Sequence, residues 1–491
     1  MTLSEEKKLI KIADELSSPF NKASNELFII LAAGHGKRIK SHTSKMLHKI
    51  WGKPTVERVY NSRVKGANTI VVVGIKAGEV MRTLGKQENT KYVIQTKQNG
   101  TGHAVQEALN KIKRNEKFER VYVLPGDVGL IDKETVKTFR NKFIKSDSDM
   151  MVLTGIYNGN PADNTYGRII RVKDTDEHGI SNGKNKGKVI QIMEAKDINL
   201  LKDKSIYKVK FNGNYQIFTK EELINCREYN SGIYAFDFTK LKSLIGTIKS
   251  QNVQKEIYIT DLIEIFNKNN FGVRAVSPKD QTTIMGFNNK SVLKEMENIA
   301  RKKVYAQLKD IIEIEDHDDF FIEDSVVGDI LKMDKQNIPL DIKIGKGVFI
   351  GKGVKLNYNT GLKRDVYICG NVLFGKNVAV YPNVSLTTFE KQKMLIEDNV
   401  QIFDGDIIKG KVKIGKGCNI ESRVNITGSD EHPVNIGTRV LIKGSSYIYG
   451  CNIADNVTII HSVLINKKIK KKGASIKFYI PEAEGVEDIG S

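Results

Sequence analysis

Aliphatic residues recur every six positions through much of the second half of this 491-residue chain. A period of six, often with a glycine after the aliphatic residue, is typical of a parallel β-helix, in which each hexapeptide forms one face of a coil. Unrelated strands would not keep this register over so many repeats. The pattern therefore predicts a parallel β-helix over residues 320–480. The repeated positions are Ile344, Ile350 and Leu356; Ile368, Phe374, Val380 and Leu386; Ile396, Ile402, Ile408, Ile414, Ile420 and Ile426; and Ile436, Ile442 and Ile448.

The first half of the chain has a different pattern, in which short β-branched runs are each followed by a turn and by helical spacing. The runs read LFIILAAG, TIVVVGI, KYVIQT, RVYVLPGD and DMMVLTGIY. Continuous apolar strands that alternate with helices indicate a buried, mostly parallel sheet. We expect an α/β, Rossmann-like domain over residues 26–290, which would bind its ligand beyond the carboxyl ends of the strands.

The remaining segments complete the expected organisation. Residues 1–25 contain an amphipathic helical pattern, and residues 291–319 begin with a long apolar stripe that predicts a helix linking two domains. Polar residues 174–187 and 203–228 predict loops or hairpins added to the α/β domain. We expect the acidic residues 481–491 to form a disordered tail.

The charge balance is strongly basic, with 78 Lys and Arg residues against 58 Asp and Glu residues and a formal net charge of +20. The basic residues are spread along the chain without a recognisable nucleic-acid-binding motif, so we expect an anionic small substrate rather than nucleic acid. The four cysteines form no CxxC pair, and the chain shows neither a signal-peptide pattern nor an apolar run long enough for a membrane span. These features predict a cytoplasmic protein without disulfides and without a membrane partner.

The stretch ILAAGHGKRIKSHTSKMLHKIWGKP, from Ile30 to Pro54, joins the end of a strand to a basic loop. Gly34 and Gly36 allow backbone N–H groups to come close to a ligand. Arg38 and Lys45 add a fork of donors and a mobile point charge, both suited to phosphate. This combination indicates a triphosphate site, although a glycine-rich turn with solvated lysines would have the same composition.

This stretch resembles the opening motif of the sugar-1-phosphate nucleotidyltransferases, most closely the bacterial N-acetylglucosamine-1-phosphate uridylyltransferases. The matching residues are the LAAG of Leu31–Gly34, then Gly36 and Arg38, then the KMLH of residues 45–48. Two positions depart from the family pattern, since Lys37 replaces the usual Thr and Ser44 the usual Pro. Neither change removes a phosphate-binding group.

Further motifs of the same family follow in order. QTKQNGTGHA resembles the uracil-binding segment, LPGD and GFNNK the magnesium-binding residues, and TYGRI, EAKD and NSG the sugar-binding residues; EIYITDLI also matches. The resemblance implies three sets of site residues: Arg38, Lys45 and Asp127 for catalysis, with Asp127 and Asn288 holding Mg²⁺; Leu31, Ala32, Ala33, Gly34, Gln95, Gly100 and Thr101 for the nucleotide; and Gly167, Glu194, Asn230 and Asn288 for the sugar.

The resemblance further implies a reaction in which UTP and N-acetylglucosamine 1-phosphate give pyrophosphate and the cell-wall precursor UDP-N-acetylglucosamine. No protein base is required, because the sugar phosphate is already ionised near neutral pH. In bifunctional relatives the β-helix also transfers an acetyl group, and such helices are left-handed and form trimers. Beyond Phe321 the chain has two histidines, His432 and His461, and neither lies in a GHLTY-like or TxxxNYDG-like segment of that second site. We therefore expect a trimer without acetyltransferase activity.

Three alternatives stay open from the sequence. The insertion at 203–228 can change which sugar 1-phosphate or nucleotide is used. A diverged acetyltransferase site can survive in the β-helix. The third alternative is a protein of another class, a non-catalytic scaffold that binds a sugar nucleotide. Such a scaffold would not need the complete set of phosphoryl-transfer residues, Arg38, Lys45, Asp127 and Asn288.

Overall fold

The computed structural model describes residues 3–34, 36, 39–249 and 256–478. The chain divides into two compact units, Met1–Met296 and Glu297–Ser491. The division falls inside the longest of the described helices, α10 (Lys290–Leu308). Arg38 and the acidic tail lie outside the described residues. Among the helices of the described part, none is long and apolar enough to cross a membrane.

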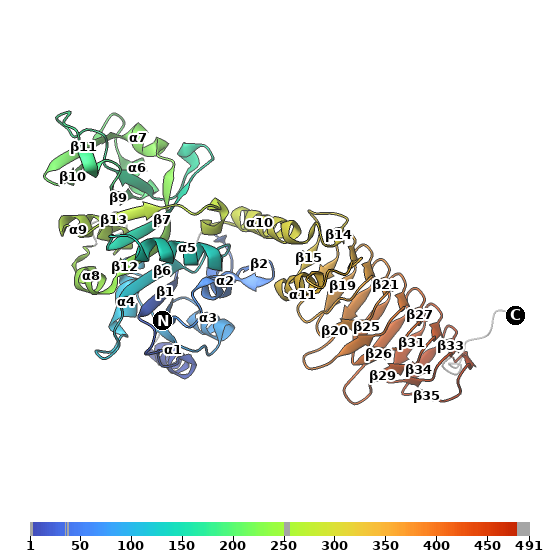
Figure 1. Cartoon of the computed structure of the whole chain (residues 1–491). Helices are drawn as coiled ribbons and strands as arrows, with labels where there is room; N and C mark the ends of the chain where they lie inside the picture. Colours follow the sequence, from blue (N-terminus) through green and yellow to red (C-terminus); the bar gives the residue numbers. More distant parts are fainter. Residues whose placement is uncertain (1–2, 35, 37–38, 250–255, 479–491) are drawn as a thin grey trace. The chain divides into compact units, whose positions relative to one another are not determined.

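The first unit is built on one twisted sheet with the strand order β13-β7-β12-β6-β1-β4-β5 (Figure 1). Within it, β1 (Glu26–Ala32) pairs in parallel with β4 on one side and β6 on the other. The antiparallel β12 then joins β6 to β7. The bounds of the other strands are β4 (Asn68–Val73), β5 (Thr90–Ile94), β6 (Arg120–Pro125), β7 (Met150–Ile156), β12 (Glu228–Asp237) and β13 (Val273–Val276).

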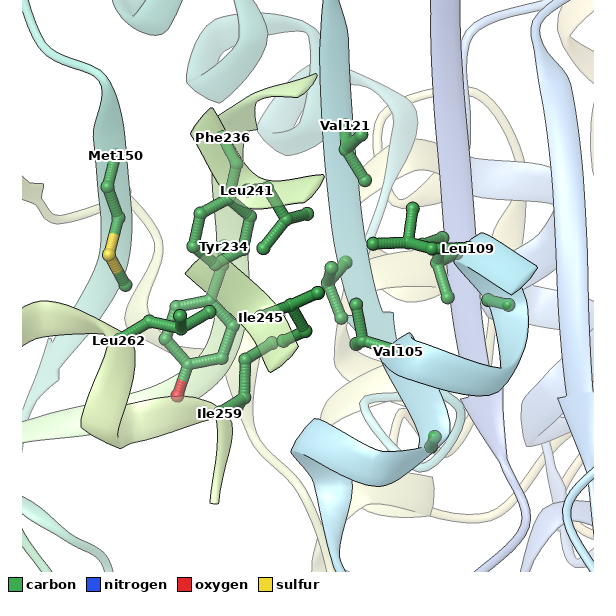
Figure 2. Close-up of a cluster of buried hydrophobic side chains, with 14 of the residues drawn as sticks. Val105, Leu109, Val121, Met150, Tyr234, Phe236, Leu241, Ile245, Ile259 and Leu262 are labelled. Atoms are coloured by element: carbon green, nitrogen blue, oxygen red, sulfur yellow. The ribbon is translucent and has the colours of Figure 1, made fainter. Parts of the chain in front are cut away.

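Both faces of this sheet are covered, which explains why its strands read as continuous apolar runs. In β1, Leu27 and Ile29 belong to one core and Phe28 and Ile30 to the other. The first core packs against α4, α8 and α9, and Figure 2 shows their side chains around Tyr234 and Phe236. The second packs against α1, α2, α3 and α5. These helices are α1 (Leu3–Leu16), α2 (Thr55–Ser62), α3 (Ala77–Leu84), α4 (Thr101–Asn110), α5 (Lys133–Ile144), α8 (Phe238–Leu244) and α9 (Leu262–Lys268).

The polar insertions form a small subdomain with a core of its own, as the prediction of hairpins suggested. A two-residue turn at Asn212 and Gly213 joins β10 to β11, and both turn residues have positive φ, as a type I′ hairpin requires. Buried residues such as Val209, Phe211 and Phe218 pack it onto the rest of the subdomain. The elements are β8 (Arg168–Arg171), β9 (Val189–Met193), α6 (Ala195–Leu200), β10 (Ile206–Phe211), β11 (Asn214–Thr219) and α7 (Lys220–Asn225).

The second unit confirms the parallel β-helix. Its strands stack into three parallel sheets, which run from β14 (Glu313–Ile314) to β36 (Ser475–Ile476), from β15 (Phe321–Ile322) to β34 (Val463–Ile465), and from β20 (Val372–Phe374) to β35 (Lys468–Ile469) (Figure 1). Every aliphatic residue of the six-residue period is buried. The corners repeatedly use Gly or Asn with positive φ, a conformation that costs these residues little.

The start of the β-helix differs from the expectation in two ways. Pairing begins at β14, within the range expected for the linker, because β14 pairs with β16 (Lys343–Ile344). A helix, α11 (Asp324–Asp334), then interrupts the stack, where the sequence analysis placed continuous repeats. The helix forms because Val326, Val327 and Ile330 lie on one buried face at helical spacing.

Candidate active site

A cavity of about 780 Å³ opens where the sequence motifs meet in the first unit. Its floor includes the segments that directly follow β1, β5 and β6, so it lies at the carboxyl ends of these parallel strands. Two residues that the sequence analysis expected at the site, Ala32 and Gly167, do not line the cavity, and Arg38 is outside the described residues. The expected residues that line it are Leu31, Ala33, Gly34, Lys45, Gln95, Gly100, Thr101, Asp127, Glu194, Asn230 and Asn288.

Lys45 is the centre of the cavity's polar contacts. Its ammonium group donates to the Asp127 carboxylate and, over 3.0 Å, to the Asn288 amide oxygen. The residue is only 8% exposed, although it is a lysine. Buried lysines are rare unless paired, so this burial is consistent with a fixed position for the charge.

The backbone around Lys45 is fixed by two further contacts. The Thr55 hydroxyl, at the start of α2, donates to the carbonyl oxygen of Met46 over 3.0 Å. Gly36 has a φ of +58°, and a Cβ atom there would lie 2.8 Å from the Cβ of Lys45. A glycine is therefore required at residue 36 for both conformation and space.

The segment after β5, which the sequence analysis expects to hold the nucleobase, also lines the cavity. The Gln95 amide nitrogen donates to the Gly100 carbonyl oxygen over 3.1 Å and lies 3.0 Å from Nδ1 of His103. Gly100 has a φ of +101°, and a Cβ atom there would lie 2.5 Å from the carbonyl oxygen of Ile257. Gln98, which the sequence analysis did not single out, donates to the Ala33 carbonyl oxygen over 2.7 Å and joins this segment to the first loop.

Glu194 and Asn230 also line the cavity. Burial, together with the nearby carboxylates of Asp197 and Asp261, raises the pKa of Glu194 to about 7. Asn230 sits at an irregularity in β12, and its amide nitrogen donates to the Tyr234 hydroxyl over 2.7 Å.

Gly167 acts behind these two side chains rather than on the cavity wall. Its carbonyl oxygen accepts a hydrogen bond of 2.9 Å from the backbone N–H of Asn230. A Cβ atom on Gly167 would lie 3.1 Å from a carboxylate oxygen of Glu194. The glycine thus allows Glu194 and the strand carrying Asn230 to approach each other.

Several lining residues had no role in the sequence analysis. Lys196 follows Glu194, and Glu256, Tyr258 and Thr260 come from the EIYITDLI motif. That motif was matched as a unit, but nothing in its spacing indicated which of its side chains face the cavity. Burial raises the pKa of Tyr258, with the surrounding carboxylates adding to the effect, so the phenol stays protonated at neutral pH.

The two side-chain oxygen atoms that contact Lys45 are suitable ligands for a divalent cation. The Asp127 carboxylate and the Asn288 amide oxygen both point at one positive charge, the Lys45 ammonium. Few protein oxygens, completed by phosphates and water, are the usual coordination of Mg²⁺. In the part of the chain that the structure describes, no group of three or more His, Cys, Asp or Glu side chains is arranged around a possible metal site. A Mg²⁺ ion here would thus need ligands from the substrates.

The two histidines of the β-helix occupy exposed positions. Nδ1 of His461 lies 2.7 Å from the Gly444 carbonyl oxygen. His432 lies against Tyr449, with 6.0 Å between the ring centroids.

Comparison with known proteins agrees with this geometry. Residues 28–168 match the model of the MobA-like NTP transferase domain, a range that includes Lys45, Gln95 and Asp127. The chain is 30% identical over 447 residues to the bifunctional protein GlmU of Acetivibrio thermocellus, with 87% of each chain covered. It is 31% identical over 454 residues to the bifunctional protein GlmU of Thermoanaerobacter pseudethanolicus, again with 87% of each chain covered.

Proposed function

The chain belongs to the GlmU family and is a nucleotidyltransferase, and from this premise we propose that it transfers a uridylyl group from UTP to N-acetylglucosamine 1-phosphate. The observation that carries the proposal is the convergence of Lys45, Asp127 and Asn288 at the wall of one cavity. Gln95 and Glu194 line the same cavity. This arrangement suits a nucleotide and a sugar phosphate that meet at a fixed centre of charge.

The reaction follows from the chemistry of the two substrates. A phosphate oxygen of the sugar 1-phosphate attacks the α-phosphorus of UTP, a new P–O bond forms, and the bond to pyrophosphate breaks. The nucleophile carries its own negative charge, because the second pKa of a phosphate ester is about 6. The protein therefore has to position the reactants and stabilise the charge that develops.

The described residues have different roles in this reaction. The Lys45 ammonium stabilises negative charge on the phosphates, and the glycines at 34 and 36 allow backbone N–H groups to approach them. The Gln95 amide oxygen can accept a hydrogen bond from the imino N–H of uracil. Glu194 and Asn230 offer acceptors and a donor to the sugar. We assign Arg38 to the same phosphate-binding set on the sequence motif alone.

The metal ligands in this proposal are Asp127 and Asn288. A bound Mg²⁺ would neutralise phosphate charge at the reacting centre. Lys45 donates to both side chains, so it fixes the positions of the oxygen atoms that would hold the ion.

We also propose that the β-helix is left-handed, that it assembles the protein as a homotrimer in the cytoplasm, and that it does not transfer acetyl groups. The missing segments around His432 and His461 support the last point. The names of the relatives, which are called bifunctional, favour the alternative of a diverged acetyltransferase site.

One assay separates these functions. The purified protein is incubated with Mg²⁺, each nucleoside triphosphate and a panel of sugar 1-phosphates, and pyrophosphate release is measured. We expect release with UTP and N-acetylglucosamine 1-phosphate. Pyrophosphate release with another pair would show that the enzyme uses other substrates. No release with any pair would favour the non-catalytic scaffold. Consumption of acetyl-CoA with glucosamine 1-phosphate would show that the acetyltransferase has been retained.

A further inference from the structure

A second cavity of about 780 Å³ lies in the first unit, away from the candidate active site. Its walls are the end of α2 and the residues after it, the loop before β5, and one face of α5. Residues 63–67 lead into β4 and residues 86–89 into β5, so these walls lie at the amino ends of the strands. The candidate active site lies at the carboxyl ends, and the two cavities share no lining residue.

The walls of this second cavity are strongly basic. They carry one carboxylate, Glu88, against six cationic side chains. Arg140 is already paired with Glu26 over 2.7 Å. For the other five cations, no ion pair is found within the residues that the structure describes. They are Arg63, Lys65, Lys86, Lys133 and Lys137.

Arg63 is the most constrained of these cations. Its guanidinium carbon lies 3.4 Å from the centroid of the Tyr60 ring, and the Tyr60 hydroxyl is held 2.8 Å from the Thr90 hydroxyl. The Nε atom of Arg63 is buried and has no hydrogen-bond partner. Burial also lowers the pKa of Arg63. A cation that is partly withdrawn from water without an anion is unfavourable, and a bound anion would compensate for this.

The face of α5 adds a row of positive charge. Lys133 and Lys137 are separated by one helical turn, and both are exposed. Like charges at this spacing destabilise a helix slightly, so this pair of lysines does not stabilise α5. The buried side of the same helix is apolar, with Val136, Phe139 and Phe143 in the core.

We propose that this second cavity binds a small anion with a di- or triphosphate group, either free pyrophosphate or a nucleoside polyphosphate. The planar guanidinium of Arg63 suits two phosphate oxygens at once, and the surrounding lysines supply point charges. The volume is within the range of small-molecule sites, about 300–1,000 Å³. A groove that holds so many cations around one concave surface favours a compact anion over an extended polyanion.

The experiment is a calorimetric titration of the full-length chain at low ionic strength. The Lys45→Ala variant serves as the background, because it weakens anion binding at the candidate active site. Pyrophosphate and ATP are titrated separately; equal affinities point to the phosphates alone, and tighter binding of ATP shows that the nucleoside contributes. We expect Arg63→Gln combined with Lys137→Gln to weaken the affinity by about tenfold or more.

Two further variants make the test specific. Lys133→Gln with Lys137→Gln changes only exposed side chains of α5, so it tests the cavity even if loss of Arg63 disturbs the fold. Lys22→Gln removes an exposed lysine elsewhere on the same unit and should leave the affinity unchanged. A DNA oligonucleotide is titrated in parallel. The proposal is overturned if neither anion binds, if binding persists in both double variants, or if the oligonucleotide binds and the two anions do not.

Discussion

The ammonium nitrogen of Lys45 lies 3.0 Å from the amide oxygen of Asn288, a residue 243 positions farther along the chain. The same nitrogen donates to Asp127, so three segments of the first unit meet at one charge. Lys45 belongs to the loop after β1, Asp127 follows β6, and Asn288 precedes α10. The fold, rather than any local sequence, brings them together.

Replacement of Lys45 by Gln tests whether this charge acts in the reaction. We expect the rate of pyrophosphate release to fall by about 100-fold or more, as when a donor to a developing negative charge is removed. Lys49→Gln is the matched control, because Lys49 is exposed and lies in the same segment. Equal rates in the two variants would show that Lys45 has only a structural role.

Asn288→Ala tests the proposed metal site. Removal of one of two protein oxygens should raise the Mg²⁺ concentration needed for half-maximal activity several-fold, and a chelator should abolish activity. Asn289→Ala is the control, since Asn289 accepts from the backbone N–H of Val292 at the start of α10. That variant should lower the thermal midpoint but leave the Mg²⁺ requirement unchanged.

The raised pKa of Glu194 predicts a pH dependence of substrate binding. With a pKa of about 7, the carboxyl group is mostly protonated at pH 6 and mostly ionised at pH 8. The ionised form accepts hydrogen bonds from sugar hydroxyls better, so KM for the sugar 1-phosphate should fall several-fold between these pH values. The phosphate itself also titrates near pH 6, and Glu194→Gln separates the two effects.

In the Glu194→Gln variant, KM should be higher at pH 8 and should change less with pH. KM for UTP should be similar in both proteins. If the pH dependence of KM for the sugar phosphate is the same with and without the carboxyl group, Glu194 is not the group that titrates.

The fold could be predicted from the sequence because its signals are local. The six-residue period predicts the β-helix, since each buried aliphatic residue marks one face of a coil. The continuous apolar runs predict the parallel sheet in the same way. Helix α11 was missed because it directly precedes the first six-residue repeats, and the sequence analysis extended the repeat region back to residue 320.

The candidate site was predicted less completely, because its contacts span the chain. Motif order indicated Lys45, Asp127 and Glu194, and these line one cavity. The sequence gives no distance between Lys45 and Asn288, and it does not show that Gly167 lies behind Glu194. Nor did it indicate the second cavity, whose lysines and arginines come from three separate segments.

The β-helix offers a test of stability that is independent of activity. Asp406 is fully buried in a column of inward-facing residues, and the corresponding positions of the neighbouring coils are Val384 and Val424. One carboxylate oxygen accepts from the backbone N–H of Val424 over 2.7 Å, and the other has no hydrogen-bond partner. Burial raises the pKa of Asp406 to about 8, well above its ordinary value of 3.8.

A carboxyl group with a raised pKa in the folded state stabilises the fold while it is protonated. Its contribution is complete below about pH 4 and is lost as the pH rises toward 8, by at most about 1.4 kcal/mol per pH unit. Asp406→Asn cannot ionise, so its thermal midpoint should equal that of the unchanged protein at pH 4 and exceed it at pH 8. Asp404→Asn, at an exposed position in the same turn, should show no such divergence. A midpoint difference between Asp406→Asn and the unchanged protein that stays constant from pH 4 to pH 8 would mean that the buried carboxyl group does not change its protonation in this range.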